Sequence, residues 1–220
     1  MRPFVFVNVA ASLDGKISDE SRKQLRISCK KDFERVDKLR AESDAIMVGI
    51  GTILADNPSL TVKNPKLREL RIKKGKDKNP IRVVVDSKCR IPLNAKILDD
   101  EAKTIVAVSK QADKSKIEEL REKNVEVVVF GEKKVDLKSL LNYLYKFGTR
   151  KLMVEGGGTL INSLVSEKLV DEIYIYYSIS LIGGKESPTI VDGKSFIKPI
   201  KLKLISLEKF GDGILVKCKF

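Results

Sequence analysis

Histidine and tryptophan are absent from this chain of 220 residues. Without histidine there is no Ser-His-Asp triad, no imidazole general base and no histidine-ligated metal. Any acid–base chemistry must therefore use Asp, Glu, Lys, Tyr, Cys or the substrate itself, and we predict no metal site.

Cysteine is scarce, and long apolar runs are missing. Cys29, Cys89 and Cys218 are far apart and form no CxxC pair, which is typical of buried thiols in a reducing compartment. No stretch approaches the ~20 apolar residues that span a membrane. The apolar start at residues 4–7 alternates like a first strand rather than like a signal peptide. We therefore expect a cytoplasmic protein with no membrane partner.

The net charge of +13 permits two interpretations. One is nucleic-acid binding through phosphate neutralisation, and the other is a solvated, lysine-rich surface. Basic and acidic residues are interleaved, and the densest basic run, residues 67–78, contains no aromatic residue for base stacking. The pattern therefore favours a solvated surface and no nucleic acid. Many Lys and Glu beside only two Gln also fit a thermophile.

Apolar runs alternate with amphipathic stretches along the chain. The pattern predicts helices at 30–43, 114–124, 136–148 and 159–169, and strands at 3–9, 44–52, 81–86, 104–109, 125–130, 151–156 and 171–182. Residues 64–79 are expected to form a charged loop or short helix, and residues 201–220 a closing antiparallel hairpin. Helices of this length between apolar strands require crossovers. We therefore predict an α/β fold with a mainly parallel central sheet, in a single domain at 1–220.

Three consecutive glycines, Gly156 to Gly158, follow an apolar run and Glu155. In open α/β sheets ligands bind beyond the carboxyl ends of strands, and the N–H groups at a helix start suit an anion such as a diphosphate. The same glycines also fit a tight joint between strand and helix. Known phosphate motifs do not decide the matter, because residues 49–54 lack the third glycine of G-x-G-x-x-G and Pro188 stands where a P-loop needs glycine.

Five motifs, taken in order, carry a resemblance that spans nearly the whole chain. They are ASLDGKI, GIGTILADNPSLTVK, IRVVVDSKCRIP, LMVEGGGTLINSLV and LVDEIYIYYSISLIGG. Together they resemble the riboflavin-biosynthesis reductases, and most of all the stand-alone archaeal and fungal members. The resemblance implies a three-layer, dihydrofolate-reductase-like fold, with helices on both faces of the sheet, and a homodimer. Bacterial relatives carry a zinc deaminase with H-x-E and P-C-x-x-C, and neither motif occurs here.

The resemblance implies an oxidoreductase that uses NADPH, with NADH a poorer cofactor. Its substrate would be a phosphorylated pyrimidine bearing a ribosylamino group, whose opened form is an imine at C1′. Hydride transfer to that carbon leaves a ribitylamino chain, and the protein supplies position and electrostatics. Two alternatives stay open: another pterin or folate reductase on the same fold, against which the late carboxylate of VEGGG argues, and a basic nucleic-acid-binding protein.

The resemblance also assigns site residues. The implied cofactor contacts are Thr52, Asp56, Arg82, Val83, Val84, Val85, Ser87, Gly131, Met153, Val154, Glu155, Gly156 and Gly157. The implied substrate contacts are Asn8, Ser12, Lys16, Arg40, Leu60, Lys63 and Glu155. Glu155 and Lys16 are the catalytic candidates, expected to flank the reacting sugar carbon. Contacts from the valines would come from their backbone, since a buried strand explains their side chains equally well.

Charged residues near these positions receive narrower expectations. Lys88 and Arg90, with Ser87, would recognise the 2′-phosphate of NADPH, and Arg40 and Lys63 would suit the 5′-phosphate of the substrate. The family usually has Arg where this chain has Lys63, which puts a bidentate clamp there in doubt. Without the resemblance, Lys16 and Arg40 read as solvated charges.

Two further expectations concern a turn and a surface. Asp14-Gly15 reads as a simple turn. The alternating residues Tyr174, Tyr176 and Tyr177 place aromatics on both faces of a strand and predict a dimer surface there.

Overall fold

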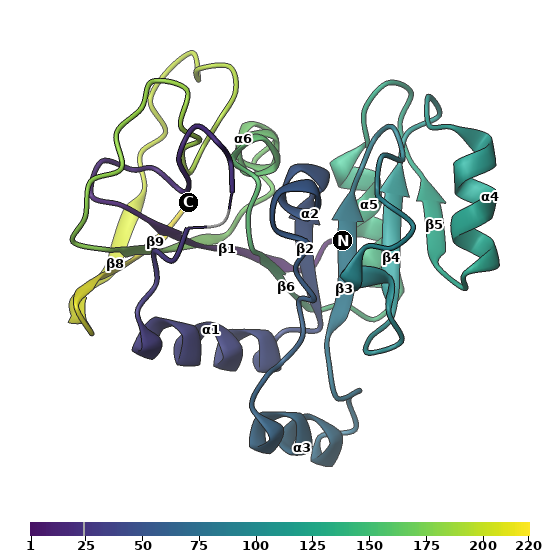
Figure 1. Ribbon diagram of the computed structural model, residues 1–220, viewed down its shortest axis with the longest axis horizontal. Coiled ribbons are helices and arrows are strands. Elements are labelled where there is room, and N and C mark those ends of the chain that lie inside the picture. Colours follow the sequence, from purple (N-terminus) through teal and green to yellow (C-terminus); the bar gives the residue numbers. More distant parts are fainter. Residues whose placement is uncertain (24) are drawn as a thin grey trace. The chain divides into compact units, whose positions relative to one another are not determined.

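The computed structural model describes residues 1–23 and 25–220, which divide into two compact units (Figure 1). Unit 1 contains residues 1–4 and 37–153, and unit 2 contains residues 5–36 and 154–220. The described residues form six α-helices, one short 3-10 helix at Lys96–Leu98 and nine strands. The predicted α/β class is confirmed.

Parallel strands form the centre of unit 1. β2 (Ala45–Gly49), β3 (Ile81–Val85), β4 (Thr104–Val108) and β5 (Glu126–Val129) pair in parallel, each with the next. β6 (Lys151–Val154) follows β2 in the strand order β5-β4-β3-β2-β6. β2, β3 and β4 carry fully buried apolar side chains on successive residues, as expected for strands covered on both faces.

Polar caps begin three helices of unit 1. Asn64 accepts a hydrogen bond from the backbone of α3 (Pro65–Lys73), Asp113 from α4 (Lys114–Glu122) and Asp136 from α5 (Leu137–Lys146). Each cap satisfies a backbone N–H that the first helical turn leaves unpaired. The charged stretch from residue 64 is therefore a helix through Lys73 rather than a loop.

The predicted strand at 44–52 is wrong in its second half. β2 ends at Gly49, and α2 (Ile50–Asp56) begins immediately. Ile50 and Ile53 are buried one turn apart, which is helical spacing. The apolar run concealed this change because periodicity does not separate a short buried helix from a strand.

Unit 2 contains the predicted hairpin. β1 (Phe4–Ala11) pairs in parallel with β7 (Glu172–Tyr177), and β7 pairs antiparallel with β9 (Gly213–Lys219). β8 (Lys203–Phe210) pairs antiparallel with β9. The hairpin turn uses Gly211 at φ 64°, where glycine has no steric penalty. α6 (Gly158–Ser166) completes the regular structure of this unit.

One residue of the predicted dimer surface, Tyr176, is buried, while Tyr174 and Tyr177 are half-buried, and the surface itself stays a prediction. β7 ends at Tyr177 and lies between β1 and β9. Tyr176 is fully buried, and its hydroxyl donates to Asp212 Oδ1 at 2.5 Å. The strand is therefore interior to its sheet, and β8 is the edge strand of this unit.

The first helix buries a different face from the one that its apolar spacing suggested. α1 (Lys30–Glu42) lies within the predicted range, but Phe33 is 48% exposed while the carboxylates of Asp32 and Asp37 are buried. Asp32 pairs with Arg35 at 2.7 Å, and Asp37 binds backbone amides. The buried side of this helix is therefore marked by two carboxylates rather than by Phe33.

The three cysteines are free thiols, in agreement with their scattered spacing. Burial raises the pKa of the Cys89 thiol to about 11, so it stays protonated near neutral pH. In the part of the chain that the structure describes, no helix has the length and apolar character of a membrane span.

Candidate active site

The carboxyl ends of the parallel strands share one edge of unit 1. Gly49 at the end of β2 lies beside Val85 of β3, which lies beside Ala107 of β4. Thr52 follows β2 in the first turn of α2, and Ser87 follows β3. Ligands of open α/β sheets bind beyond this kind of edge. Thr52 and Ser87 therefore lie at this edge of the sheet, and their contact with a cofactor stays a prediction.

Ser87 connects that edge to the loop after β5. The Ser87 hydroxyl accepts from the Val135 amide at 3.1 Å, and its carbonyl accepts from the Ser109 hydroxyl at 2.7 Å. Gly131 begins this loop at φ 80°, and a Cβ there would lie 2.2 Å from the Lys134 carbonyl oxygen. A hydroxyl that accepts one bond can still donate its own hydrogen, so Ser87 can serve a phosphate as well as the loop.

The turn after β3 folds around a buried carboxylate. Asp86 Oδ2 accepts from the Ile91 amide at 2.8 Å, and Asp86 Oδ1 lies 3.5 Å from Arg90 Nε. The Arg90 side chain is more than half exposed, and Cys89 has a left-handed φ of 55°. This turn exposes Arg90, three residues after Ser87, to solvent.

Three predicted cofactor residues of β3, namely Arg82, Val83 and Val84, are fully buried in the sheet. Val83 and Val84 are fully buried, with neighbours in both β2 and β4. Only Val85 reaches the carboxyl edge, so any cofactor contact from this strand is easiest there.

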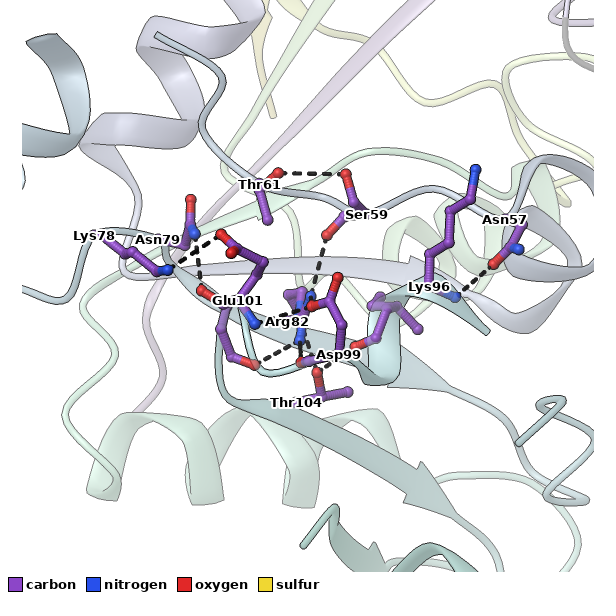
Figure 2. Close-up of polar contacts among 12 residues, drawn as sticks. Asn57, Ser59, Thr61, Lys78, Asn79, Arg82, Lys96, Asp99, Glu101 and Thr104 are labelled. Atoms are coloured by element: carbon purple, nitrogen blue, oxygen red, sulfur yellow. Dashed lines mark hydrogen bonds and ion pairs between the residues drawn. The ribbon is translucent and has the colours of Figure 1, made fainter. Parts of the chain in front are cut away.

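The side chain of Arg82 is fully buried and makes five hydrogen bonds. Figure 2 shows the polar contacts around it. Its partners are Thr104 Oγ1, Asp99 Oδ1, and the carbonyls of Ser59, Asp99 and Ala102. Arginine has five N–H donors. No side-chain donor of Arg82 remains for a cofactor, and a contact would have to come from its backbone.

Asp56 and Met153 are further predicted cofactor residues in unit 1. Asp56 is the last residue of α2, and burial raises the pKa of its carboxyl group. The helix stops there because Asn57 takes a left-handed φ of 42°. Met153 is fully buried in β6. Asp56 is therefore the more accessible of the two to a ligand.

Unit 1 also brings Arg40 and Lys63 to one short segment. Lys63 Nζ donates to Ser59 Oγ at 2.7 Å and to Thr61 Oγ1 at 2.8 Å. Arg40 donates to the Thr61 carbonyl at 3.1 Å. Burial, followed by the nearby charges of Arg40 and Arg68, lowers the pKa of Lys63. Two cations with two hydroxyl groups suit a phosphate group.

Leu60 lies in the same segment but is almost fully buried. Its φ is 49°, a left-handed conformation that is uncommon for a leucine. Its side chain therefore anchors the segment in the protein interior.

The glycine run of unit 2 connects the end of β6 to α6, and its last residue lies close to Thr189. Val154, at the end of β6, is fully buried. Gly156 has φ 138° and Gly157 has φ 87°, values that side chains rarely adopt. Gly158 begins α6, and a Cβ there would lie 2.6 Å from the Thr189 carbonyl oxygen. Each glycine therefore has a structural reason, which leaves anion binding an additional possibility rather than the necessary explanation.

Ser12 and Lys16 form a tight loop in unit 2. The Ser12 amide donates to the Lys16 carbonyl at 2.9 Å, and the Lys16 amide donates to Ser12 Oγ at 3.0 Å. Lys16 Nζ donates to the Ser187 carbonyl at 3.1 Å. Glu155 follows β6 in the same unit and is half-buried. The catalytic roles of Glu155 and Lys16 stay predictions.

Asp14 organises this loop more firmly than a simple turn would. Its carboxylate accepts from the Ser12 hydroxyl and from the amides of Ile182 and Gly183. These bonds, the Ser12 hydroxyl first, lower the pKa of Asp14 to about 2. Asp14 thus joins the loop carrying Lys16 to the segment after β7.

Asn8 lies on β1, the strand that leads into this loop, and carries a hydrogen-bond acceptor without a partner among the described residues. The residue is almost fully buried, and the acceptor is its Oδ1. Buried polar atoms are usually satisfied. Such an atom fits a residue whose partner is a ligand, as the resemblance implied.

Sequence reasoning missed Asp37. Both of its carboxylate oxygens accept backbone amides, from Lys63 at 2.6 Å and Asn64 at 2.7 Å. The available signal was its position four residues after Phe33 in an amphipathic helix, where the pattern called for an apolar residue.

Comparison with known proteins identifies the chain's relatives. The model of the RibD C-terminal domain matches residues 3–216. A 2,5-diamino-6-ribosylamino-4(3H)-pyrimidinone 5′-phosphate reductase of Archaeoglobus fulgidus is 63% identical over 100% of this chain and 99% of its own length. A reductase of the same name from Methanothermobacter thermautotrophicus is 42% identical over 99% of this chain and 98% of its own.

A solved structure shows the same fold. A pyrimidine reductase-like protein from Corynebacterium diphtheriae superposes with a TM-score of 0.87 at 21% identity, covering 99% of this chain and 91% of that one. The sequence match, over nearly the whole length, agrees with the five motifs. This chain belongs to the RibD C-terminal domain family.

Proposed function

We propose that this protein reduces the ribosylamino group of 2,5-diamino-6-ribosylamino-4(3H)-pyrimidinone 5′-phosphate to a ribitylamino group in riboflavin biosynthesis, with NADPH as the hydride donor. The observation that carries the proposal is 63% identity over the full length to a reductase of that name. The family match also argues against a basic nucleic-acid-binding protein.

Each unit, taken by itself, offers residues that fit one part of a dinucleotide cofactor. Gly156 and Gly157 have no Cβ at the start of α6, so a diphosphate can approach the backbone there. Ser87, Lys88 and Arg90 follow β3 and can recognise a 2′-phosphate. We propose NADPH, with NADH used less well, on this basis.

The chain's own residues would bind and orient the substrate. Arg40 and Lys63 bind its 5′-phosphate, and Asn8 accepts a hydrogen bond from a substrate N–H or O–H group. When bound, NADPH would supply the hydride that C1′ of the opened, imine form accepts. Glu155 stabilises the cationic imine and Lys16 holds a sugar oxygen, which accounts for catalysis without histidine.

We also propose that both units act as a single reductase domain in a cytoplasmic homodimer. The three free thiols suit a reducing compartment. For the dimer, the edge strand β8 exposes Leu204, Ile205 and Leu207 at 56%, 50% and 63%. Exposed apolar edge strands are natural pairing surfaces.

The test is a direct assay of the purified protein. NADPH oxidation should require the ribosylamino substrate, and mass spectrometry should find a product heavier by two hydrogens. Dihydrofolate serves as the competing substrate. Turnover of dihydrofolate but not of the ribosylamino compound would favour the pterin or folate alternative and reject the proposal.

A further inference from the structure

Residues 59–64 form an irregular segment whose backbone is held by side chains. Asp37, on α1, binds it most closely: Oδ1 accepts from the Lys63 amide at 2.6 Å and Oδ2 from the Asn64 amide at 2.7 Å. Asp37 is buried, and hydrogen bonds to a carboxylate are stronger than those between neutral groups.

Two more side chains fix the middle of the segment. The Val62 amide donates to Asn79 Oδ1 at 2.9 Å, and Arg68 Nε donates to the Val62 carbonyl at 2.6 Å. Asn79 also donates to the Glu101 carbonyl at 2.8 Å. Asn79 thereby ties the segment to the chain before β4.

Arg82, on β3, contacts both the beginning of the segment and the chain before β4. It donates to the Ser59 carbonyl at 3.4 Å and to Asp99 Oδ1 at 2.7 Å, as Figure 2 shows. The contact with Ser59 is long, whereas those of Asp37 are short and come from both oxygens. Asp37 is therefore the strongest single constraint on this segment.

The segment carries the chemistry assigned to the substrate phosphate. Lys63 Nζ is within 2.8 Å of the hydroxyl oxygens of Ser59 and Thr61. Asp37 binds the backbone amide of Lys63 and leaves the ammonium to these hydroxyls. It therefore sets where the ammonium stands without contacting an anion that would bind there.

We infer that Asp37 is a positioning residue for substrate binding: it holds the backbone of Lys63 and Asn64 so that the Lys63 ammonium meets the phosphate of the substrate. This inference rests on the proposed function. The residue acts through Lys63 and takes no part in hydride or proton transfer.

The experiment replaces Asp37 by Ala in the full chain. Losing both acceptors frees the segment, and displacements of about 1 Å can cost about a hundredfold in enzymes. We expect KM for the phosphorylated pyrimidine to rise at least about tenfold, with KM for NADPH unchanged and kcat within about threefold. The Asp37→Glu variant, which keeps both oxygens, should recover part of the loss.

Two measurements do not depend on turnover. Amide hydrogen exchange at Lys63 and Asn64 should become about tenfold or more faster in Asp37→Ala, since hydrogen bonds to charged groups are lost. Binding of ribose 5-phosphate, measured by calorimetry, should weaken by a similar factor. If the wild-type protein fails to reduce the pyrimidine, the proposed function fails, yet these measurements still test the role of Asp37.

Asp113→Ala is the matched control. Asp113 also accepts a backbone amide, that of Ser115 at 2.9 Å, at the start of α4. Its loss should leave KM for the pyrimidine unchanged. If Asp37→Ala does not fold, Asp37→Asn, which keeps the size and one acceptor, should show smaller changes in the same direction. Unaltered exchange at both amides, or equal KM changes in the Asp37 and Asp113 variants, would overturn the inference.

Discussion

At the scale of single residues, Glu155 is the most consequential prediction. The chain has no histidine, and we propose Glu155 as the ionisable group beside the imine; it is half-buried directly after β6. Glu155→Gln keeps the shape but removes the charge, so kcat should fall about a hundredfold to ten-thousandfold. NADPH affinity, measured by fluorescence titration, should stay nearly constant. The exposed Glu167 provides the control substitution Glu167→Gln, and comparable kcat in both variants would assign Glu155 a structural role.

A second prediction at the residue scale concerns the choice between NADPH and NADH. Lys88 and Arg90 follow Ser87 in an exposed turn. If they recognise the 2′-phosphate, replacing both with Met should lower kcat/KM for NADPH and leave that for NADH almost unchanged. Steady-state kinetics with the two cofactors gives the ratio. An equal loss with both would show that these cations serve another purpose.

Asp14 predicts how the free energy of unfolding changes at acidic pH. Its hydrogen bonds lower the pKa of the folded carboxyl from 3.8 to about 2. A depressed folded pKa stabilises the native state above the unfolded pKa, and that contribution is lost as pH falls from about 4 to about 2. Urea unfolding at several pH values should show this loss, and Asp14→Asn should flatten the curve in that window. A curve unchanged by the substitution would contradict the assignment.

At the scale of elements, the joint between β6 and α6 depends on glycine. Gly158→Ala would place a Cβ 2.6 Å from the Thr189 carbonyl oxygen, and overpacking of this kind typically costs about 1–3 kcal/mol. Gly51→Ala is the matched control in α2, because its Cβ meets nothing within 4 Å. Alanine there should stabilise by about 0.5–1 kcal/mol. Chemical denaturation measures both, and equal effects would contradict the packing argument.

The backbone conformation of Gly156 limits what a substitution there can show about cofactor binding. The glycine pattern suggests that Gly156→Val would block a diphosphate while leaving the fold largely intact. With φ at 138°, a β-branched residue would be strained whatever the space around it. Loss of NADPH binding in that variant would therefore not separate a blocked site from a damaged joint.

At the scale of the whole molecule, the exposed edge strand β8 predicts self-association. Leu204 and Leu207 are more than half exposed on β8, and charges on an edge strand oppose pairing. The double substitution Leu204→Glu and Leu207→Glu should shift the protein from dimer to monomer in size-exclusion chromatography with light scattering. Replacing the exposed Leu70 of α3 by Glu is the control. A wild-type monomer, or a dimer unaffected by the β8 changes, would contradict the prediction.

The sequence by itself determined the order of the elements and the family. Unbroken apolar strands, a capping residue at Asp136, and five ordered motifs are local patterns, and local patterns are read directly from the chain. The approximate positions of most strands and helices followed for the same reason. The exceptions were short elements. One is α2, which continues the apolar run of β2, so that the sequence did not show where the strand ends and the helix begins.

Only the tertiary structure decided which polar residues are buried and hydrogen-bonded in the interior. Arg82 seemed available to a cofactor, but its donors are all engaged within unit 1. Asp37 received no assignment from the sequence, but it holds the backbone of Lys63 and Asn64. Tyr176 was expected on a surface, but it is buried and its hydroxyl donates a hydrogen bond to Asp212. The physical reason is that a buried polar group needs partners, and those partners lie far away in the sequence.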